Sequence, residues 1–129
     1  MAGNIAAPSQ IGSIEFAAAN FGCPLVLVLG HSRCGAVKAT LDAMQQNTGS
    51  PSPSLAKIVE RIVPALEPLV AQEDDSPDLL EHAIRANVHA CVEALLENSE
   101  IIAALAAEGS LRVIGAQYAL ETGQVEFFG

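Results

Sequence analysis

Residues 24–37 read PLVLVLGHSRCGAV and decide the fold. Five consecutive apolar residues, 25–29, follow Pro24, and such a short run predicts a strand that is buried on both faces. Gly30 is expected to end this strand, and Gly35 opens an amphipathic pattern that continues to about residue 46. The stretch therefore predicts a buried strand, a tight turn and a helix, which is the repeating unit of an α/β fold.

Two side chains that can bind metal lie on the predicted turn. His31 and Cys34 are three residues apart at the carboxyl end of the strand, where open α/β sheets place their ligands. The dipole of the following helix favours a thiolate at its N-terminus, and a thiolate with an imidazole is a zinc-binding pair. The spacing alone leaves two interpretations open: a metal site, or a structural turn with Cys34 packed as a small apolar group.

The composition suits one domain over residues 1–129, with half of the residues hydrophobic. The formal net charge of −9 argues against binding to nucleic acid or to an anionic membrane surface. No apolar run is long enough to span a membrane. The odd number of cysteines (Cys23, Cys34 and Cys91) and an N-terminus without the pattern of a secretory signal favour reduced thiols and a cytoplasmic location.

Helical spacing of apolar residues predicts four further helices, three of them after a capping serine: 10–20 after Ser9 with Gly22 as its C-terminal stop, a pattern from residue 55, 77–97 after Ser76, and 100–107 after Ser99. Pro64 and Pro68 are expected to kink or split the second of these helices, and residues 47–54 to form a loop before it. Two more strands, 111–118 and 124–128, are predicted to form a hairpin around a turn at 121–123. The expected fold class is α/β, with about three strands flanked by helices.

One enzymatic interpretation uses Ser32 as a nucleophile. Residues 30–34, GHSRC, are similar to the G-x-S-x-G elbow of α/β-hydrolases, and an acid among Asp74, Asp75 and Asp78 could act with His82 or His89. Against this interpretation, Cys34 stands where the elbow has glycine. In addition, both histidines fall on a predicted helix, and the hydrolase fold needs more strands than this chain predicts.

The stretch GHSRCGAVKA, residues 30–39, resembles the second zinc motif of the β-class carbonic anhydrases. Other segments follow in that family's order and extend the resemblance over nearly the whole chain: AGNI at 2–5, GSIEFA at 12–17, NV at 87–88, GAQY at 115–118 and TGQV at 122–125. The resemblance implies a mostly parallel sheet with an antiparallel last strand, assembled as a homodimer or a larger oligomer. It also implies a lyase, carbonate dehydratase, which reversibly hydrates carbon dioxide to bicarbonate or acts on a related substrate such as carbonyl sulfide.

The resemblance also implies roles for four residues. His31 and Cys34 would be two of the three protein ligands of one zinc ion, which activates a water molecule. Ser32 and Gly35 would shape the substrate pocket. In the family the third ligand is a cysteine of a C-x-D-S-R motif that precedes the AGN segment, and this sequence does not contain that motif. Ala119 stands where the family usually has aspartate.

Two hypotheses follow from the missing motif. In the first, a separate chain supplies the motif, or a neighbouring subunit lends Cys23, Cys91, His82 or His89. In the second, the protein is a truncated, catalytically silent relative that acts as an oligomeric or metal-binding scaffold. Loss of the family's first two strands would expose the edge of strand 25–29, and a bare apolar edge pairs readily with another chain. We therefore expect an obligate oligomer whose sheet continues across an interface.

Overall fold

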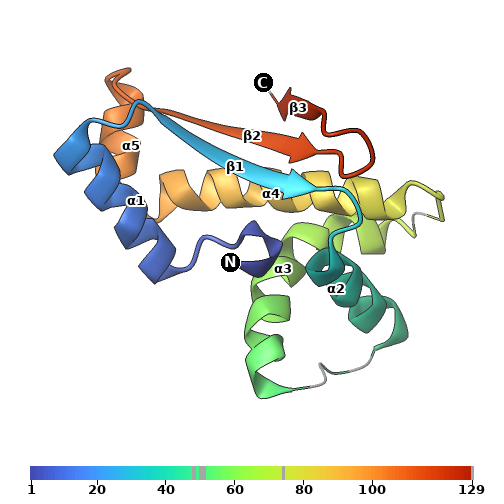
Figure 1. Cartoon of the computed structure of the whole chain (residues 1–129). Helices are drawn as coiled ribbons and strands as arrows, with labels where there is room; N and C mark the ends of the chain where they lie inside the picture. The colour runs from blue at the N-terminus through green and yellow to red at the C-terminus, as the bar shows by residue number, and fades with distance from the viewer. Residues whose placement is uncertain (48, 50–51, 74, 129) are drawn as a thin grey trace.

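A computed structural model describes residues 1–47, 49, 52–73 and 75–128 of the chain (Figure 1). The elements follow in the order η1 (Ala2–Asn4), α1 (Pro8–Phe21), β1 (Leu25–His31), α2 (Gly35–Gln46), α3 (Pro53–Ala71), α4 (Leu79–Glu97), α5 (Glu100–Ala107), β2 (Arg112–Tyr118) and β3 (Val125–Phe128). The α/β fold class and the three strands are confirmed. None of the helices in the described part of the chain is long and apolar enough to cross a membrane.

The three strands form one sheet in the order β1-β2-β3. β1 and β2 are parallel, with Val28 opposite Gly115, whereas β2 and β3 are antiparallel, with Gly115 opposite Phe128. The predicted hairpin between the last two strands is therefore confirmed. Because β1 and β2 are parallel, their carboxyl ends, at His31 and Tyr118, lie side by side at one edge of the sheet.

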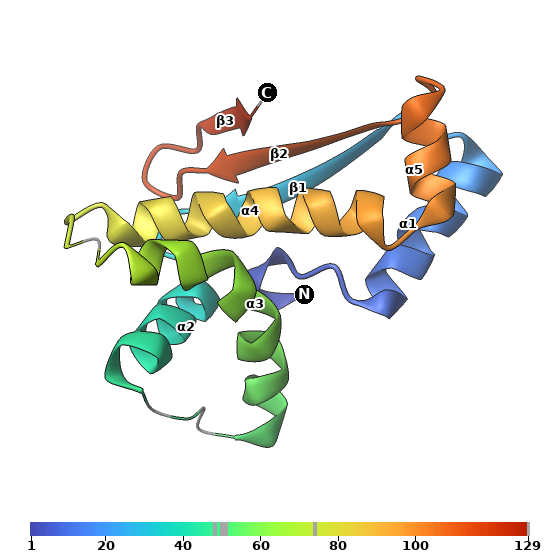
Figure 2. The ribbon, with the colours of Figure 1, turned by 180° about the vertical axis from the view of Figure 1, so that it is seen from behind.

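Helix α4 packs against one face of the sheet, as Figure 2 shows from behind. A Cβ atom added at Gly30 would lie 2.6 Å from Val88 Cγ2, and one added at Gly115 would lie 2.7 Å from Val88 Cγ1. The two glycines therefore permit the close approach of helix and sheet. The prediction that Gly30 ends the strand is wrong, because β1 continues to His31 and Gly30 pairs with Gln117 inside the ladder.

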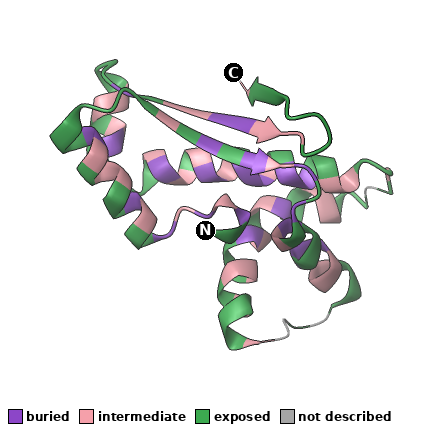
Figure 3. Ribbon diagram, in the orientation of Figure 1, coloured by how far each residue is buried: buried purple, intermediate pink, exposed green. Residues whose placement is uncertain are grey.

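The opposite face of the sheet is open in the described chain. Leu25, Leu27 and Leu29 are 50%, 37% and 42% exposed, and exposed and buried residues alternate along β1 in Figure 3. The prediction that this strand is buried on both faces is wrong. An apolar run shows which residues can be buried, but it does not show which segment covers them. β1 is also an edge strand, since it pairs with β2 alone.

The predicted helix ends agree in part with the structure. Gly22 ends α1 in the left-handed region, at φ 62°, as predicted. The capping role predicted for Ser9 is wrong: Ala7 is the N-cap and Pro8 is the first helical residue, where proline loses no hydrogen bond. Ser99 caps α5 as predicted, because its hydroxyl accepts a hydrogen bond from the Ile102 N–H.

α2 starts at Gly35 as predicted, whereas the starts of α3 and α4 each differ by two residues from the prediction. Asp78 rather than Ser76 is the N-cap of α4, and the Ser76 hydroxyl accepts from the Asp78 N–H in the preceding turn. α3 contains Pro64 and Pro68 without being split, and Figure 2 shows it changing direction along its length, as a proline kink predicts. The predicted loop 47–54 is shorter in the structure, because α3 already begins at Pro53, and residues 48, 50 and 51 lie outside the described residues.

Buried residues form two clusters on either side of the N-terminal segment. One cluster lies among α2, α3 and α4 and includes Cys34, and the other joins α1, α4 and α5 to the sheet and includes Cys91. The buried Asn87 side chain donates a 2.8 Å hydrogen bond to the Gly3 carbonyl. This bond ties η1 to the middle of α4, so the N-terminal segment is fixed beneath the carboxyl end of β1.

Candidate functional site

The candidate site is the turn that joins the carboxyl end of β1 to α2. His31 is the last residue of the strand and Cys34 is the N-cap of the helix, so two residues, Ser32 and Arg33, make the turn. Arg33 adopts φ 56°, which is unusual for a residue with a Cβ atom. Such a conformation is retained only where neighbouring contacts enforce it.

The imidazole of His31 is held in one orientation by the backbone. Its Nδ1 atom lies 2.8 Å from the Ser32 carbonyl oxygen. Because a carbonyl oxygen can only accept a hydrogen bond, Nδ1 carries the proton and donates it to this bond. The lone pair of the neutral ring is then on Nε2, which is the arrangement of a metal-binding histidine whose second nitrogen is fixed by a carbonyl.

Cys34 is a free thiol, as are Cys23 and Cys91. Its side chain is 4% exposed and belongs to the buried cluster that also contains Ile5 and Val37. The thiol thus sits at the boundary between the turn and the apolar core, at the N-terminus of α2. This burial fits a packed cysteine as well as a metal ligand, so both interpretations of Cys34 persist.

The donor types match zinc, but their number does not. Within the described residues, no group of three or more histidine, cysteine, aspartate or glutamate side chains could hold a metal ion. A catalytic zinc site needs three protein ligands and one open position. His31 and Cys34 by themselves would therefore be an incomplete ligand set for such a site.

Two of the four additional donors considered from the sequence, Cys91 and His89, already have partners within the chain. Cys91 is buried and accepts a 3.3 Å hydrogen bond from the Asn4 side chain, and burial raises the pKa of its thiol. It is thus inaccessible to a neighbouring subunit. His89 stacks on Phe128, with 5.3 Å between the ring centroids. Cys23, by contrast, is exposed just before β1.

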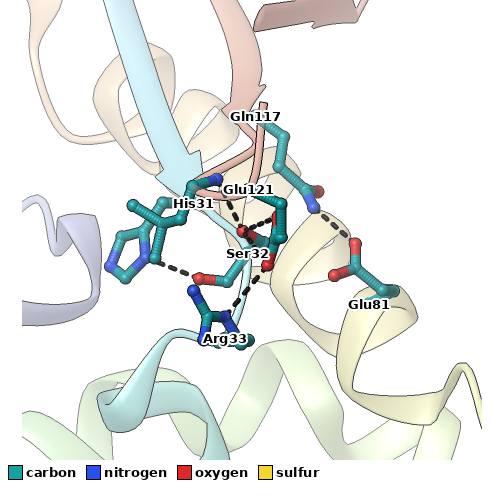
Figure 4. A network of polar contacts seen from close by, with 7 residues as sticks. His31, Ser32, Arg33, Glu81, Gln117 and Glu121 are labelled. Atoms are coloured by element: carbon teal, nitrogen blue, oxygen red, sulfur yellow. Dashed lines mark hydrogen bonds and ion pairs between the residues drawn. The ribbon is translucent and has the colours of Figure 1, made fainter. Parts of the chain in front are cut away.

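Ser32 is the most highly connected residue of the turn (Figure 4). Its hydroxyl donates to the Glu121 carboxylate, at 3.0 Å from Oε2 and 3.3 Å from Oε1, and accepts from the Leu120 N–H at 2.9 Å. Its own N–H donates to the Tyr118 carbonyl at 2.9 Å. The side chain is therefore fully engaged, with the residue only 6% exposed. These contacts place a carboxylate, and no imidazole, on the hydroxyl, which argues against the serine hydrolase.

Glu121 also binds Arg33, whose Nε lies 2.9 Å from Glu121 Oε1. The backbone N–H of Glu121, the Ser32 hydroxyl and the Arg33 guanidinium hold the pKa of the Glu121 carboxyl below its usual range. The sequence prediction did not identify this residue. A usable signal was present, since the parallel pairing of β1 and β2 brings the residues that follow both strands to the same edge of the sheet.

The two residues predicted to shape one pocket line different cavities. Ser32 lines a cavity of about 640 Å³ with Gln117 and Glu121, whereas Gly35 lines a cavity of about 460 Å³ between α2 and α3. The first cavity also receives the carboxylates of Glu81 and Glu126, so its lining is strongly acidic. A shared pocket for Ser32 and Gly35 remains a prediction.

The comparisons with known proteins agree with this fold and identify the family of the chain. The family model described as carbonic anhydrase matches residues 1–125. The chain belongs to the carbonic anhydrase family. Carbonic anhydrase 2 of Mycobacterium tuberculosis strain H37Rv is 36% identical over 123 residues, which are 95% of this chain and 58% of that protein. A carbonic anhydrase of Mycolicibacterium smegmatis is 36% identical over 125 residues, 97% of this chain and 59% of that protein.

Solved structures show that this carbonic anhydrase family member has the β-class fold. The Coccomyxa β-carbonic anhydrase in complex with acetazolamide superposes with a TM-score of 0.82, at 24% identity, over 98% of this chain and 58% of that one. A tetrameric β-carbonic anhydrase of Sordaria macrospora gives a TM-score of 0.81, at 23% identity, over 99% and 65%. The chain thus spans little more than half the length of the curated relatives it matches.

Proposed function

We propose that this chain contributes two zinc ligands and part of the substrate site to a β-carbonic anhydrase that reversibly hydrates carbon dioxide to bicarbonate. The observation that carries the proposal is the His31 ring at the end of β1, whose Nδ1–H is bonded to the Ser32 carbonyl, with Cys34 three residues further at the N-terminus of α2. The family assignment of the domain supports it.

The chain's own residues prepare two of the donors. The Ser32 carbonyl fixes the His31 ring so that Nε2 offers its lone pair, and Cys34 places its thiol at the N-terminus of α2. A zinc ion, when bound, would supply a hydroxide at neutral pH by lowering the pKa of a coordinated water. Ser32 and Gly35 flank these donors and would line the substrate pocket.

Completion of the site requires a third donor from another segment or another chain. We infer a homo-oligomer, because β1 leaves one backbone edge unpaired in the described chain and presents exposed leucines beside it. The tetrameric Sordaria relatives support this assembly. Cys23, an exposed thiol two residues before β1, is one donor that another copy could supply. The three free thiols support a cytoplasmic location.

The test combines metal analysis with stopped-flow hydration of carbon dioxide on the purified protein. We expect about one zinc per completed site and a hydration rate above buffer, with both lost in Cys34→Ala and His31→Ala. Cys91→Ala is the matched control, because it removes a buried thiol from the other cluster and should keep the zinc. Zinc at full occupancy with no rate above buffer would exclude the enzyme.

That same outcome would support a second function, an oligomeric or metal-binding scaffold without catalysis. The observation that favours it is the incomplete ligand set among the described residues. A scaffold retains its oligomeric state when His31 and Cys34 are replaced. An enzyme in which Cys23 of a neighbouring copy is the third ligand loses zinc when Cys23 is replaced by serine.

A further inference from the structure

Glu121 connects the C-terminal hairpin to the turn that bears the two proposed ligands. Figure 4 shows its carboxylate between Ser32 and Arg33, the two residues that separate His31 from Cys34. We propose that Glu121 is a positioning residue, which fixes the conformation of this turn and thereby the orientation of the His31 ring. The role of this positioning in zinc binding rests on the proposed function, whereas the effect of Glu121 on the turn and on the His31 ring does not.

The first step of the argument is the path from Glu121 to His31. Glu121 and the Leu120 N–H hold the Ser32 hydroxyl from two sides, at 3.0 Å and 2.9 Å. The carbonyl of the same Ser32 accepts the hydrogen bond from His31 Nδ1 at 2.8 Å. Rotation of the peptide after Ser32 would break the bond that selects the ring's tautomer. Glu121 therefore acts on His31 through one intervening residue.

The second step is the conformation of Arg33. A residue with a Cβ atom is disfavoured at φ 56°, so a turn built from Arg33 needs contacts that enforce it. The ion pair between Arg33 Nε and Glu121 Oε1, at 2.9 Å, is such a contact. One carboxylate thus restrains both residues of the turn, the first by its hydroxyl and the second by its guanidinium.

The third step is the rigidity of the segment that carries Glu121. The hairpin turn is closed by hydrogen bonds from the Ala119 N–H to the Gln124 carbonyl and from the Gly123 N–H to the Ala119 carbonyl, both 2.8 Å. Directly before this turn, the Ser32 N–H bonds to the Tyr118 carbonyl. The backbone that carries the Glu121 carboxylate is therefore held in place by hydrogen bonds, and this carboxylate restrains the turn at residues 32–33.

Glu126 provides a matched control on the same hairpin. Its carboxylate lies 2.8 Å from Arg85 Nη2 and is 65% exposed, compared with 52% for the side chain of Glu121. Both are exposed glutamates paired with an arginine, but Glu121 bonds to Ser32 and Arg33 of the turn, whereas the partner of Glu126 is Arg85 on α4. Any effect of lost charge or of a lost surface ion pair should appear equally in Glu121→Ala and Glu126→Ala.

The first experiment measures thiol labelling of metal-free protein, with each cysteine followed separately by peptide mass spectrometry. We expect Cys34 to react at least about tenfold faster in Glu121→Ala than in wild type, because the turn above it is released. Cys91, buried in the other cluster, reports global opening and should keep its rate. Equal acceleration of Cys34 and Cys91, or no acceleration of Cys34, would overturn the proposal.

The second experiment reads the His31 tautomer from its ring nitrogen chemical shifts, again without metal. Wild type and Glu126→Ala should show the proton on Nδ1, and Glu121→Ala should show a mixture of tautomers. Glu121→Gln keeps an oxygen acceptor for the Ser32 hydroxyl and should restore the wild-type tautomer. A pure Nδ1–H ring in Glu121→Ala would overturn the proposal. Both readouts are independent of zinc and of hydration activity, so failure of the proposed function would not affect them.

Discussion

The Glu121 carboxylate lies 3.0 Å from the Ser32 hydroxyl, although 89 residues separate them in the sequence. Four helices, α2 to α5, lie between the two residues along the chain. Because β1 and β2 pair in parallel, the residues that follow both strands nevertheless lie at the same edge of the sheet. The turn at residues 32–33 is therefore stabilised by the β2–β3 hairpin as well as by β1 and α2, which flank it. Substitutions in the hairpin should therefore change the conformation of the turn.

Close packing of α4 on the sheet gives the first prediction. Gly30→Ala places a Cβ atom 2.6 Å from Val88 Cγ2, so strand or helix must shift, and we expect a loss of about 1–3 kcal/mol in the free energy of unfolding. Urea denaturation measures it. Gly12→Ala on α1 is the control, because the added Cβ atom would meet no atom within 4 Å. Within a helix, alanine is preferred over glycine by up to about 1 kcal/mol, so this variant should not lose stability. Equal stabilities of the two variants would contradict the packing argument.

The cap of α5 gives the second prediction. The Ser99 hydroxyl accepts from the Ile102 N–H at 3.1 Å and donates to Glu15 Oε1 at 2.6 Å, and the residue is 2% exposed. Ser99→Ala should therefore cost about 1–2 kcal/mol, since a buried cap and its carboxylate partner are both lost. Thermal unfolding followed by circular dichroism measures the change. Ser13→Ala, which removes an exposed bond to the Ser9 carbonyl, should cost close to nothing.

Local signals predicted most elements correctly where the determinants are themselves local. Gly22 ends α1 and Ser99 starts α5 because a left-handed residue and a side-chain acceptor are properties of one position. The error at Ser9 arose because two N-terminal signals, serine and proline, compete within two residues, and Pro8 determined the start. The extra residues of β1 depend on pairing with β2, which no local pattern contains.

The candidate donors could be identified from the sequence, whereas the contacts that support their turn were not identified from it. His31 and Cys34 follow from a motif within four residues, whereas Glu121 acts from the far end of the chain. Burial of β1 was overestimated for a related reason. Leu25 and Leu29 have the residue type of a covered strand, but they are 50% and 42% exposed in the part of the chain that the structure describes.

The ion pair and hydrogen bonds of Glu121 give a pH prediction. Its pKa in the folded state is lowered from the ordinary value of 4.5, so the unfolded chain binds more protons in this range. The stabilisation by the carboxylate is therefore complete above the unfolded value and is lost as the pH falls through the folded one. Urea titrations at several pH values should show a steeper acid loss for wild type than for Glu121→Gln. Parallel curves for the two proteins would contradict this assignment.

The open face of β1 gives the last prediction, on the proposed oligomer. Leu27 is 37% exposed in the middle of an edge strand, so the fold of one chain tolerates lysine there. The charge would, however, oppose pairing of this strand with another chain and disrupt an apolar contact between the two chains. Light scattering at micromolar concentration should show a multimer for wild type and a smaller species for Leu27→Lys. The Leu27→Lys monomer should unfold at a midpoint similar to that of wild type at the same subunit concentration. Val28→Lys is the control on the same strand: Val28 is 7% exposed against α4, and its replacement should unfold the chain. A wild-type monomer under these conditions would contradict the oligomer, because the exposed leucines would then remain uncovered in solution.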